Sequence, residues 1–346
     1  MRVLVTGGAG FIGSHVVDAL HGAGHEVVVL DRDDAHLPAA AEHVRGDVRD
    51  PQAVARALRG VDAVSHQAAR VGLGTDLLDI ADYSADNDFG TAVLIRELVR
   101  SGFAGRFVLA SSMVVYGEGR YRCAEHGIVR PGPRARADLE ARRFEPPCPV
   151  CGEPLTPEAI PEDAPLDPRN VYAATKLHQE HLCNALAREG GVPVTALRYH
   201  NVYGPRLPRD TPYAGVAALF LSALLAGRAP SVFEDGDQLR DFVHVRDVAR
   251  ANVLALTAPE AVDGALNVCS GSPRTVGAMA HALADAVGGS GLTPRTTGEF
   301  RLGDVRHVFA SADRARDVLG FDAREDFAAG MRELHEQTVN GGPQAS

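Results

Sequence analysis

The sequence contains no tryptophan, and among its 35 lysines and arginines Lys176 is the only lysine. Arginine occupies every other basic position, so we infer that position 176 requires an ammonium group. The two cations differ in shape, because an ammonium is a compact point charge whereas guanidinium is a broad, rigid fork. Lys176 is therefore the first candidate for a residue with a chemical role.

The sequence also has no long apolar run, and we expect no leader. No run reaches the roughly 18 residues of a membrane-spanning helix, and Met1 leads directly into a strand-like stretch. We therefore expect a cytoplasmic protein without a membrane partner. The formal charge of -10 argues against nucleic acid as the main partner, since that requires a basic face. Five cysteines in 346 residues are too few for a disulfide framework.

Tyr172 precedes Lys176 at i, i+4, so on a helix the two side chains share one face. An ordinary tyrosine has a pKa of about 10, and bringing it near neutrality takes about 4 kcal/mol of stabilisation of the phenolate. A neighbouring cation supplies part of that. The pair predicts a tyrosine base activated by lysine, whereas the simpler explanation is a chance pair on a helix surface.

A glycine-rich turn follows the first predicted strand, residues 2–6. Gly7, Gly10 and Gly13 lead into a helical pattern, and such glycines permit a tight turn and close backbone approach to a pyrophosphate. A second strand ends at Asp31, where a carboxylate binds ribose hydroxyls and repels a 2'-phosphate. We therefore expect NAD rather than NADP, a preference that Arg32 moderates.

Further strands alternate with helices along the first two hundred residues, which predicts an α/β fold with a doubly wound parallel sheet. Ser112 follows the strand at 106–110, so its side chain is expected in the ligand crevice, although a strand-end serine is also an ordinary cap. His66 is expected to be a hydrogen-bonded strand-end histidine. Arg240 and Arg301 are candidates for binding a diphosphate, whereas Arg246 is expected in a surface ion pair.

Residues 118–168 interrupt the alternation. This stretch contains Cys123, His126, Cys148 and Cys151, two pairs of ligands at x2 spacing that are each followed by glycine. Such spacing is typical of a tetrahedral structural zinc site. The metal would order an insertion with few apolar residues. The alternative is a loose surface loop with free thiols.

These patterns divide the chain into two lobes and a tail. We expect a Rossmann domain at 1–204, with 118–168 inserted and 240–257 returning to it. A nucleotide-sugar-binding lobe is expected at 205–239 and 258–340, and a frayed tail at 341–346.

Together the glycine turn, Ser112, Tyr172-x-x-x-Lys176, Asn201-Val-Tyr-Gly-Pro205, Arg240-Asp-Phe-Val-His244 and Arg301-x-Gly-Asp304 resemble the extended short-chain dehydrogenases/reductases that act on nucleotide sugars. The resemblance implies that Tyr172 is the base, that Lys176 binds the nicotinamide ribose and lowers the tyrosine pKa, and that Ser112 orients the reacting hydroxyl. It implies substrate contacts at Ser112, Asn201, Arg240, Arg301 and Asp304, and a homodimer. The expected NAD contacts are Gly7, Gly10, Phe11, Ile12, Gly13, Asp31, Arg32, Asp47, Val48, Gln67, Ala68, Ala69, Asn87, Tyr172, Lys176 and Tyr199.

Within that family, dehydratases carry an Asp-Glu pair and decarboxylases a Glu just after the strand-end residue, where this sequence has Met113-Val114. What remains is hydride and proton transfer at one carbon, which favours a 4-epimerase working through a 4-keto sugar. The cysteine pairs, Pro212-Tyr213 and Glu234-Asp-Gly236 are similar to dTDP-L-rhamnose 4-epimerases, although His126 stands where a second cysteine is expected; UDP-galactose 4-epimerases are the other close resemblance. An NAD(P)H-dependent 4-ketosugar reductase and a dinucleotide-sensing regulatory protein are the alternatives.

Overall fold

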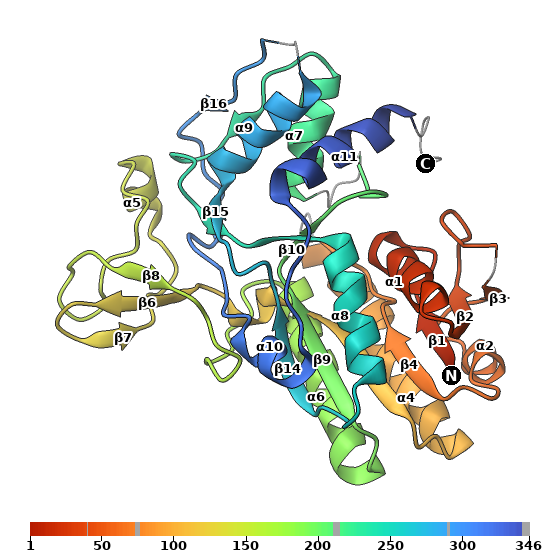
Figure 1. Ribbon diagram of the computed structural model, residues 1–346. Helices are drawn as coiled ribbons and strands as arrows, with labels where there is room; N and C mark the ends of the chain where they lie inside the picture. Colours follow the sequence, from red (N-terminus) through yellow and green to blue (C-terminus); the bar gives the residue numbers. More distant parts are fainter. Residues whose placement is uncertain (40, 73–76, 210–214, 289–290, 341–346) are drawn as a thin grey trace.

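The protein is built around one seven-stranded parallel sheet with the strand order β14-β9-β5-β4-β1-β2-β3 (Figure 1). The structure, a computed structural model, describes residues 1–39, 41–72, 77–209, 215–288 and 291–340. The strands of this sheet are β1 (Arg2–Thr6), β2 (Glu26–Asp31), β3 (Glu42–Arg45), β4 (Ala63–His66), β5 (Arg106–Ser112), β9 (Val194–Tyr199) and β14 (Gly264–Val268).

Helices cover both faces of the sheet, because alternate side chains of each strand point to opposite faces. Val3 and Val5 belong to the core beneath one helix layer, whereas Leu4 belongs to the core beneath the other. The first layer contains α1 (Phe11–Gly22), α8 (Val245–Thr257) and α10 (Asp313–Leu319); the second contains α2 (Pro51–Ala57), α4 (Gly90–Ser101) and α6 (Val171–Gly190). This arrangement confirms the predicted doubly wound α/β fold.

A second lobe packs beyond the carboxyl ends of the strands, at the top of Figure 1. Its core lies among α7 (Val216–Leu225), α9 (Val276–Val287) and α11 (Phe327–Asn340). Short strands pair around it: β10 (Asn201–Tyr203) with β13 (Phe242–His244), β11 (Ser231–Val232) with β16 (Arg295–Thr296), and β12 (Leu239–Arg240) with β15 (Arg274–Thr275).

The insertion forms a small unit of its own, drawn in yellow at the left of Figure 1. Its antiparallel strands are β6 (Arg120–Cys123), β7 (Gly127–Val129) and β8 (Thr156–Glu158). The short helix α5 (Arg136–Glu140) lies between β7 and β8 in the chain. Its hydrophobic cluster is small, with Tyr121, Cys123, Cys148 and Leu155 as the buried members. A hydrophobic cluster this small contributes little stability, which is consistent with the expectation that another interaction stabilises the fold of the insertion.

Several boundaries differ from the expectations. Residues 258–340 are predicted in the substrate lobe, yet β14 pairs with β9 at the edge of the large sheet. Three short helical segments that the sequence pattern did not single out, η1 (Leu77–Asp79), α3 (Ile80–Tyr83) and the π-helical η2 (Ser84–Phe89), run directly into α4. A further short helix, η3 (Met113–Tyr116), follows β5. The exact lobe boundaries stay a prediction, and Pro212, Tyr213 and the tail at 341–346 lie outside the described residues.

None of the helices in the described part of the chain is both long enough and apolar enough to cross a membrane.

His66 is buried at the end of β4, and its ring nitrogens contact Thr6 Oγ1 at 2.7 Å and Thr91 Oγ1 at 2.9 Å. The expectation of a hydrogen-bonded strand-end histidine is therefore confirmed. Burial lowers the pKa of His66 to about 3. Because the unfolded chain binds more protons between pH about 3 and about 6.5, folding stability falls as the pH falls through that window.

We expect His66 to contribute about 2 kcal/mol to the loss of stability between pH 7 and pH 5. The measurement is the free energy of unfolding in denaturant at both pH values for the wild type and for His66→Gln. The variant should lose less stability between the two values than the wild type. His181→Gln, at an exposed position of α6, is the matched control. An equal pH dependence in H66Q and the wild type would contradict the assignment.

Candidate active site

A cavity of about 1420 Å³ lies between the carboxyl ends of the sheet strands and the second lobe. Ligands bind at this edge of open α/β sheets. The cavity brings together every predicted catalytic, cofactor and substrate residue except Asn87. Those that line it are Gly7, Gly10, Phe11, Ile12, Gly13, Asp31, Arg32, Asp47, Val48, Gln67, Ala68, Ala69, Ser112, Tyr172, Lys176, Tyr199, Asn201, Arg240, Arg301 and Asp304.

The glycine turn between β1 and α1 leaves no room for side chains. Gly7 has φ +68°, and a Cβ there would lie 2.7 Å from Ala68 Cα; a Cβ on Gly13 would lie 2.0 Å from the Gly7 oxygen. Gly10 is the N-cap of α1 and no side chain caps that helix, so its first N–H groups remain available to a ligand. This end of the cavity therefore fits a pyrophosphate.

Two carboxylates lie at the same end of the cavity. Asp31 ends β2 and its Oδ2 accepts a hydrogen bond of 2.9 Å from the Ala9 N–H, which places the carboxylate beside the glycine turn. Asp47 is held by Arg49 through bonds of 2.9 and 2.6 Å, and these bonds lower the pKa of Asp47. Arg32 approaches Asp47 at 3.6 Å. The pair matches the expected site for the adenosine half of NAD.

Asn87 does not line the cavity, and its contact with the cofactor stays a prediction. The residue is fully buried, its Oδ1 accepts from the Arg70 N–H at 2.7 Å, and its Nδ2 donates to the Arg70 oxygen and to Thr175 Oγ1. The amide thus ties the segment after β4 to α6. Asn87 lies within the π-helical η2, a turn that the sequence did not reveal.

Tyr172 lies in the first turn of α6, which Asn170 caps by accepting from the Ala173 N–H at 2.8 Å. The Ser112 side chain lies near enough to the Tyr172 hydroxyl to favour the phenolate, and it also caps η3 by accepting from the Val114 N–H at 3.4 Å. Burial raises the pKa of Tyr172 above its ordinary value, and Ser112 opposes that rise. A phenol in this setting needs a cation to act as a base near neutral pH.

Lys176 lies one helical turn from Tyr172, with its Nζ 5.9 Å from the centre of the Tyr172 ring. Its side chain is buried, Nζ donates a bond of 2.9 Å to the Ala110 oxygen, and burial lowers the lysine pKa to about 8. A guanidinium is too broad for such a place. The lone lysine of the sequence is therefore the cation beside the candidate base.

The second lobe contributes a cation without a partner acid. Arg240 donates bonds of 2.8 Å to the backbone oxygens of Leu239, Val305 and Arg306, and it forms no ion pair among the described residues. Burial lowers its pKa. Arg301 lies over the Phe233 ring at 5.4 Å. A buried guanidinium bonded only to neutral oxygens attracts an anionic ligand.

Asn201 lies next to this cation in the cavity wall, and its buried Oδ1 has no hydrogen-bond partner within the described segments. A buried amide oxygen is normally bonded, so this one is available to a ligand. Asp304 also lines the cavity, and burial raises the pKa of its carboxyl while Arg301 opposes that rise.

Some residues at the site carried no sequence signal. The Tyr199 hydroxyl accepts bonds from Gln67 at 3.1 Å and from Asn252 at 2.8 Å, so Asn252 of α8 orients two predicted cofactor contacts. Glu234 and Arg228 also line the cavity, and no recognised motif includes Arg228. The ion pair expected for Arg246 is confirmed, with Glu325 and Glu333 as its partners.

The four predicted metal ligands of the insertion converge, with all ligand atoms within 4.8 Å of one another. The sulfurs of Cys123 and Cys151 lie 3.6 Å apart, and His126 Nδ1 lies 3.5 Å from Cys123 Sγ and 3.9 Å from Cys148 Sγ. A tetrahedral zinc site with bonds of about 2.3 Å to sulfur and about 2.1 Å to nitrogen has edges of about 3.8 and 3.5 Å. The geometry fits that metal.

Comparison with known proteins places these residues in a family. The profile of the NAD dependent epimerase/dehydratase family matches residues 3–133 and 148–269. The chain is 35% identical to a dTDP-L-rhamnose 4-epimerase of Burkholderia thailandensis, over 96% of this chain and 93% of the relative. It is 31% identical to a UDP-glucose 4-epimerase of Azospirillum brasilense, over 95% and 89%. The crystal structure of Thermus thermophilus UDP-glucose 4-epimerase with NAD superposes with a TM-score of 0.79 at 30% identity, covering 99% of this chain and all of that one.

Proposed function

Because the chain belongs to the NAD dependent epimerase/dehydratase family, we propose that it is an NAD-dependent nucleotide-sugar 4-epimerase. The observation that carries this proposal is the group formed by Ser112, Tyr172 and Lys176 in a cavity where Met113 and Val114 stand beside the serine. Elimination of water needs an additional acid and base, and these two side chains supply neither. Transfer of a hydride and a proton at one carbon needs only the three residues present.

The glycine turn, Asp31 and Asp47 hold NAD in this proposal. The N–H groups at the start of α1 bind its pyrophosphate, and the Asp31 carboxylate accepts from the adenosine ribose hydroxyls. When bound, NAD would supply the hydride acceptor and donor for oxidation and reduction at C4 of the sugar. The small side chains of Ala68 and Ala69 let the cofactor approach the backbone. The Gln67 side chain is held in place by its hydrogen bond to the Tyr199 hydroxyl.

Tyr172 removes the proton from the C4 hydroxyl and later gives it back. Ser112 holds that hydroxyl through its own hydrogen bond, and Lys176 stabilises the phenolate across one helical turn. The sugar is held by its diphosphate at Arg240 and Arg301 and by the Asn201 amide, so the 4-keto sugar turns without leaving the cavity. Asp304 accepts from hydroxyl groups of the substrate.

We take dTDP-L-rhamnose, or a related NDP-hexose, as the substrate, because the Burkholderia relative carries that name and matches over nearly its whole length. A 4-ketosugar reductase would use the same three residues but would consume reduced cofactor. The relatives named above are epimerases and do not favour it. A regulatory protein that only senses dinucleotides has no use for the complete catalytic group.

The test is incubation of the purified protein, without added cofactor, with dTDP-L-rhamnose, UDP-galactose and UDP-glucuronate in heavy water, followed by NMR of the sugar. Interconversion at C4 without incorporation of deuterium is the expected result, because the hydride never exchanges with solvent. Absence of conversion together with rapid NADH oxidation in the presence of a 4-keto sugar would replace the epimerase by the reductase.

The zinc site of the insertion is a second part of the proposal. Cys123, His126, Cys148 and Cys151 would hold one structural Zn²⁺, and four protein ligands leave no open position for catalysis. We predict about one zinc per chain by elemental analysis of protein purified without a metal-binding tag, and a loss of that zinc in Cys151→Ser. Wild-type protein that carries no zinc after refolding with the metal would refute the site.

The predicted homodimer is retained as a proposal with a surface to support it. Ile80, Phe89 and Val99 are large apolar side chains exposed along α3, η2 and α4. Such a patch is typical of a surface that a partner covers. Light scattering of the purified protein measures its mass in solution. The cytoplasmic location stays a prediction.

A further inference from the structure

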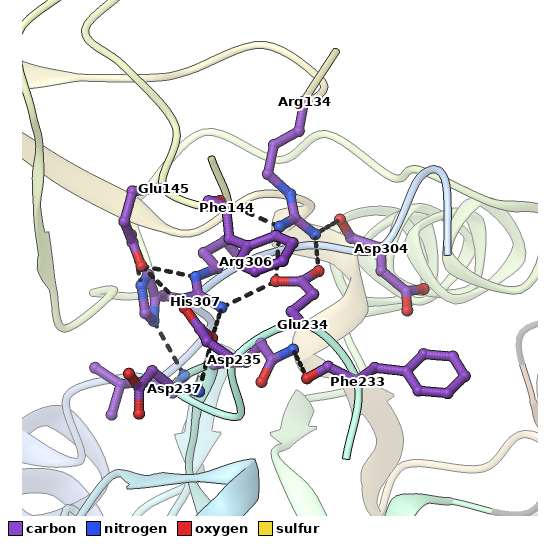
Figure 2. Close-up of polar contacts among 12 residues, drawn as sticks. Arg134, Phe144, Glu145, Phe233, Glu234, Asp235, Asp237, Asp304, Arg306 and His307 are labelled. Atoms are coloured by element: carbon purple, nitrogen blue, oxygen red, sulfur yellow. Dashed lines mark hydrogen bonds and ion pairs between the residues drawn. The ribbon is translucent and has the colours of Figure 1, made fainter. Parts of the chain in front are cut away.

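A buried ion-pair network joins the insertion to the wall of the cavity (Figure 2). Arg134 of the insertion donates two bonds, of 2.8 and 2.9 Å, to the carboxylate of Glu234 in the second lobe. Both side chains are only 3% exposed. The same guanidinium donates to the Asp304 backbone oxygen at 2.8 Å, and the Asp304 carboxylate points away from the network (Figure 2).

Arg306 completes the network from the opposite side. Its guanidinium donates to Glu234 at 2.9 Å and to both oxygens of Asp235 at 2.7 and 2.8 Å. It also donates to Glu145 of the insertion at 2.7 Å, and His307 contacts the other Glu145 oxygen at 2.9 Å. Arg306 is therefore committed to carboxylates and is not available to a substrate phosphate.

The network reaches the metal site along two short stretches of chain. Tyr121 lies two positions before the ligand Cys123, and its hydroxyl donates to Glu118 at 2.8 Å and accepts from the His307 N–H. Glu145 lies shortly before the ligand Cys148. A metal bound to both cysteines fixes the distance between these two anchoring stretches, which the small hydrophobic cluster of the insertion does little to hold.

On the cavity side, the same network holds residues that the proposed substrate touches. Glu234 lines the cavity and has φ +55°, a backbone region that residues with side chains rarely adopt. Phe233, against which Arg301 packs, precedes it, and Asp304 follows the loop that carries Arg301. Arg134 is one of the two guanidinium groups that hold Glu234, and it is the one that ties this wall to the insertion.

We propose that the insertion is a metal-held clamp on the nucleotide-sugar pocket, in which Arg134 is a positioning residue that fixes the wall formed by Phe233, Glu234, Arg301 and Asp304. The insertion would bind one Zn²⁺, and the pocket would bind the nucleotide-diphosphate sugar. The identity of the sugar ligand rests on the proposed function. Residues 134–147, which include Arg134 and Glu145, stand between the two stretches that the family profile matches.

The test compares four variants with the wild type. Arg134→Gln removes the ion pair with Glu234. Arg134→Lys keeps the positive charge but cannot form the bidentate hydrogen bond to the Glu234 carboxylate. Cys151→Ser removes an exposed metal ligand. Arg143→Gln is the matched control, because Arg143 is 65% exposed and pairs within the insertion with Asp138 at 2.6 Å.

We expect R134Q to raise the KM for the nucleotide sugar at least about tenfold, with kcat within about threefold and zinc content unchanged, since the buried Glu234 carboxylate loses one of its two guanidinium partners and keeps only Arg306. R134K should fall between R134Q and the wild type, and R143Q should match the wild type. C151S should lose zinc and show the same rise in KM, and the double variant R134Q/C151S should be no worse than either single variant.

Hydrogen exchange separates failure of the clamp from failure of the proposed function, because it requires no substrate. In R134Q and C151S, exchange should accelerate at 231–240 and 301–308 while β1 and β2 keep wild-type protection. Unchanged exchange at those segments would overturn the clamp, whatever the activity. Acceleration there in a protein that converts none of the sugars would retain the clamp and reject the epimerase. Equal loss of protection in β1 and β2 would show general unfolding and would also overturn it.

Discussion

Tyr172→Phe is expected to lower kcat for epimerisation by about 10³-fold, within the range of 10² to 10⁴ that a general base contributes. The loss arises because Phe keeps the ring that packs at 6.2 Å from Tyr83 but removes the only group placed to take the proton. Bound NAD and the KM should change little, since the phenol oxygen contributes most in the transition state. The measurement is kcat and KM by NMR, with the cofactor content determined on the same preparation.

Tyr116→Phe is the matched control for this experiment. Tyr116 is also buried near the end of β5, but its hydroxyl bonds Asn267 at 2.7 Å and Arg198 at 2.9 Å and does not line the cavity. Its loss should lower the free energy of unfolding by about 1 to 3 kcal/mol and leave kcat near the wild-type value. A Y172F variant that keeps more than a tenth of wild-type kcat would remove Tyr172 from the role of base.

Lys176→Arg should lower kcat by about 10²-fold or more although it preserves the charge, because guanidinium is broader than the buried space that Lys176 occupies. Lys176→Met removes the charge with less change of shape. If the site requires both the charge and the compact shape of an ammonium, the two variants should be similarly impaired. If charge alone were needed, K176R would be nearly as active as the wild type, and that result would contradict the interpretation of the lone lysine.

The pH dependence gives a second measure of Lys176. Burial lowers its pKa to about 8, so the ammonium is present below that pH and is lost above it. We expect kcat/KM in the wild type to decline as the pH rises through about 8. K176M should lack this decline, since it has no ammonium to lose. A wild-type profile that keeps rising to pH 9.5 would show that the protonated lysine is not required.

The catalytic group and the dinucleotide site were predictable because their chemistry depends on local spacing. Tyr172 and Lys176 share a helix face by their separation alone, and the glycine turn lies between a strand and a helix that are both adjacent in sequence. Asn87 lies in a π-helical turn that the sequence pattern did not predict, and its contact with the cofactor stays a prediction.

The sequence by itself determined the alternation of strands and helices in the first two hundred residues, the spacing of the catalytic pair, the glycine turn and the spacing of the candidate metal ligands within the insertion. The tertiary structure decided that β14 joins the large sheet and that Arg306 serves carboxylates rather than phosphate. It also decided that Arg134 meets Glu234 and Asp304, which lie 100 and 170 positions away. The physical reason is the sequence separation over which each interaction acts. Periodicity and turn chemistry depend on residues that are neighbours in the sequence, whereas a buried arginine–carboxylate pair forms only after the fold has brought distant residues together.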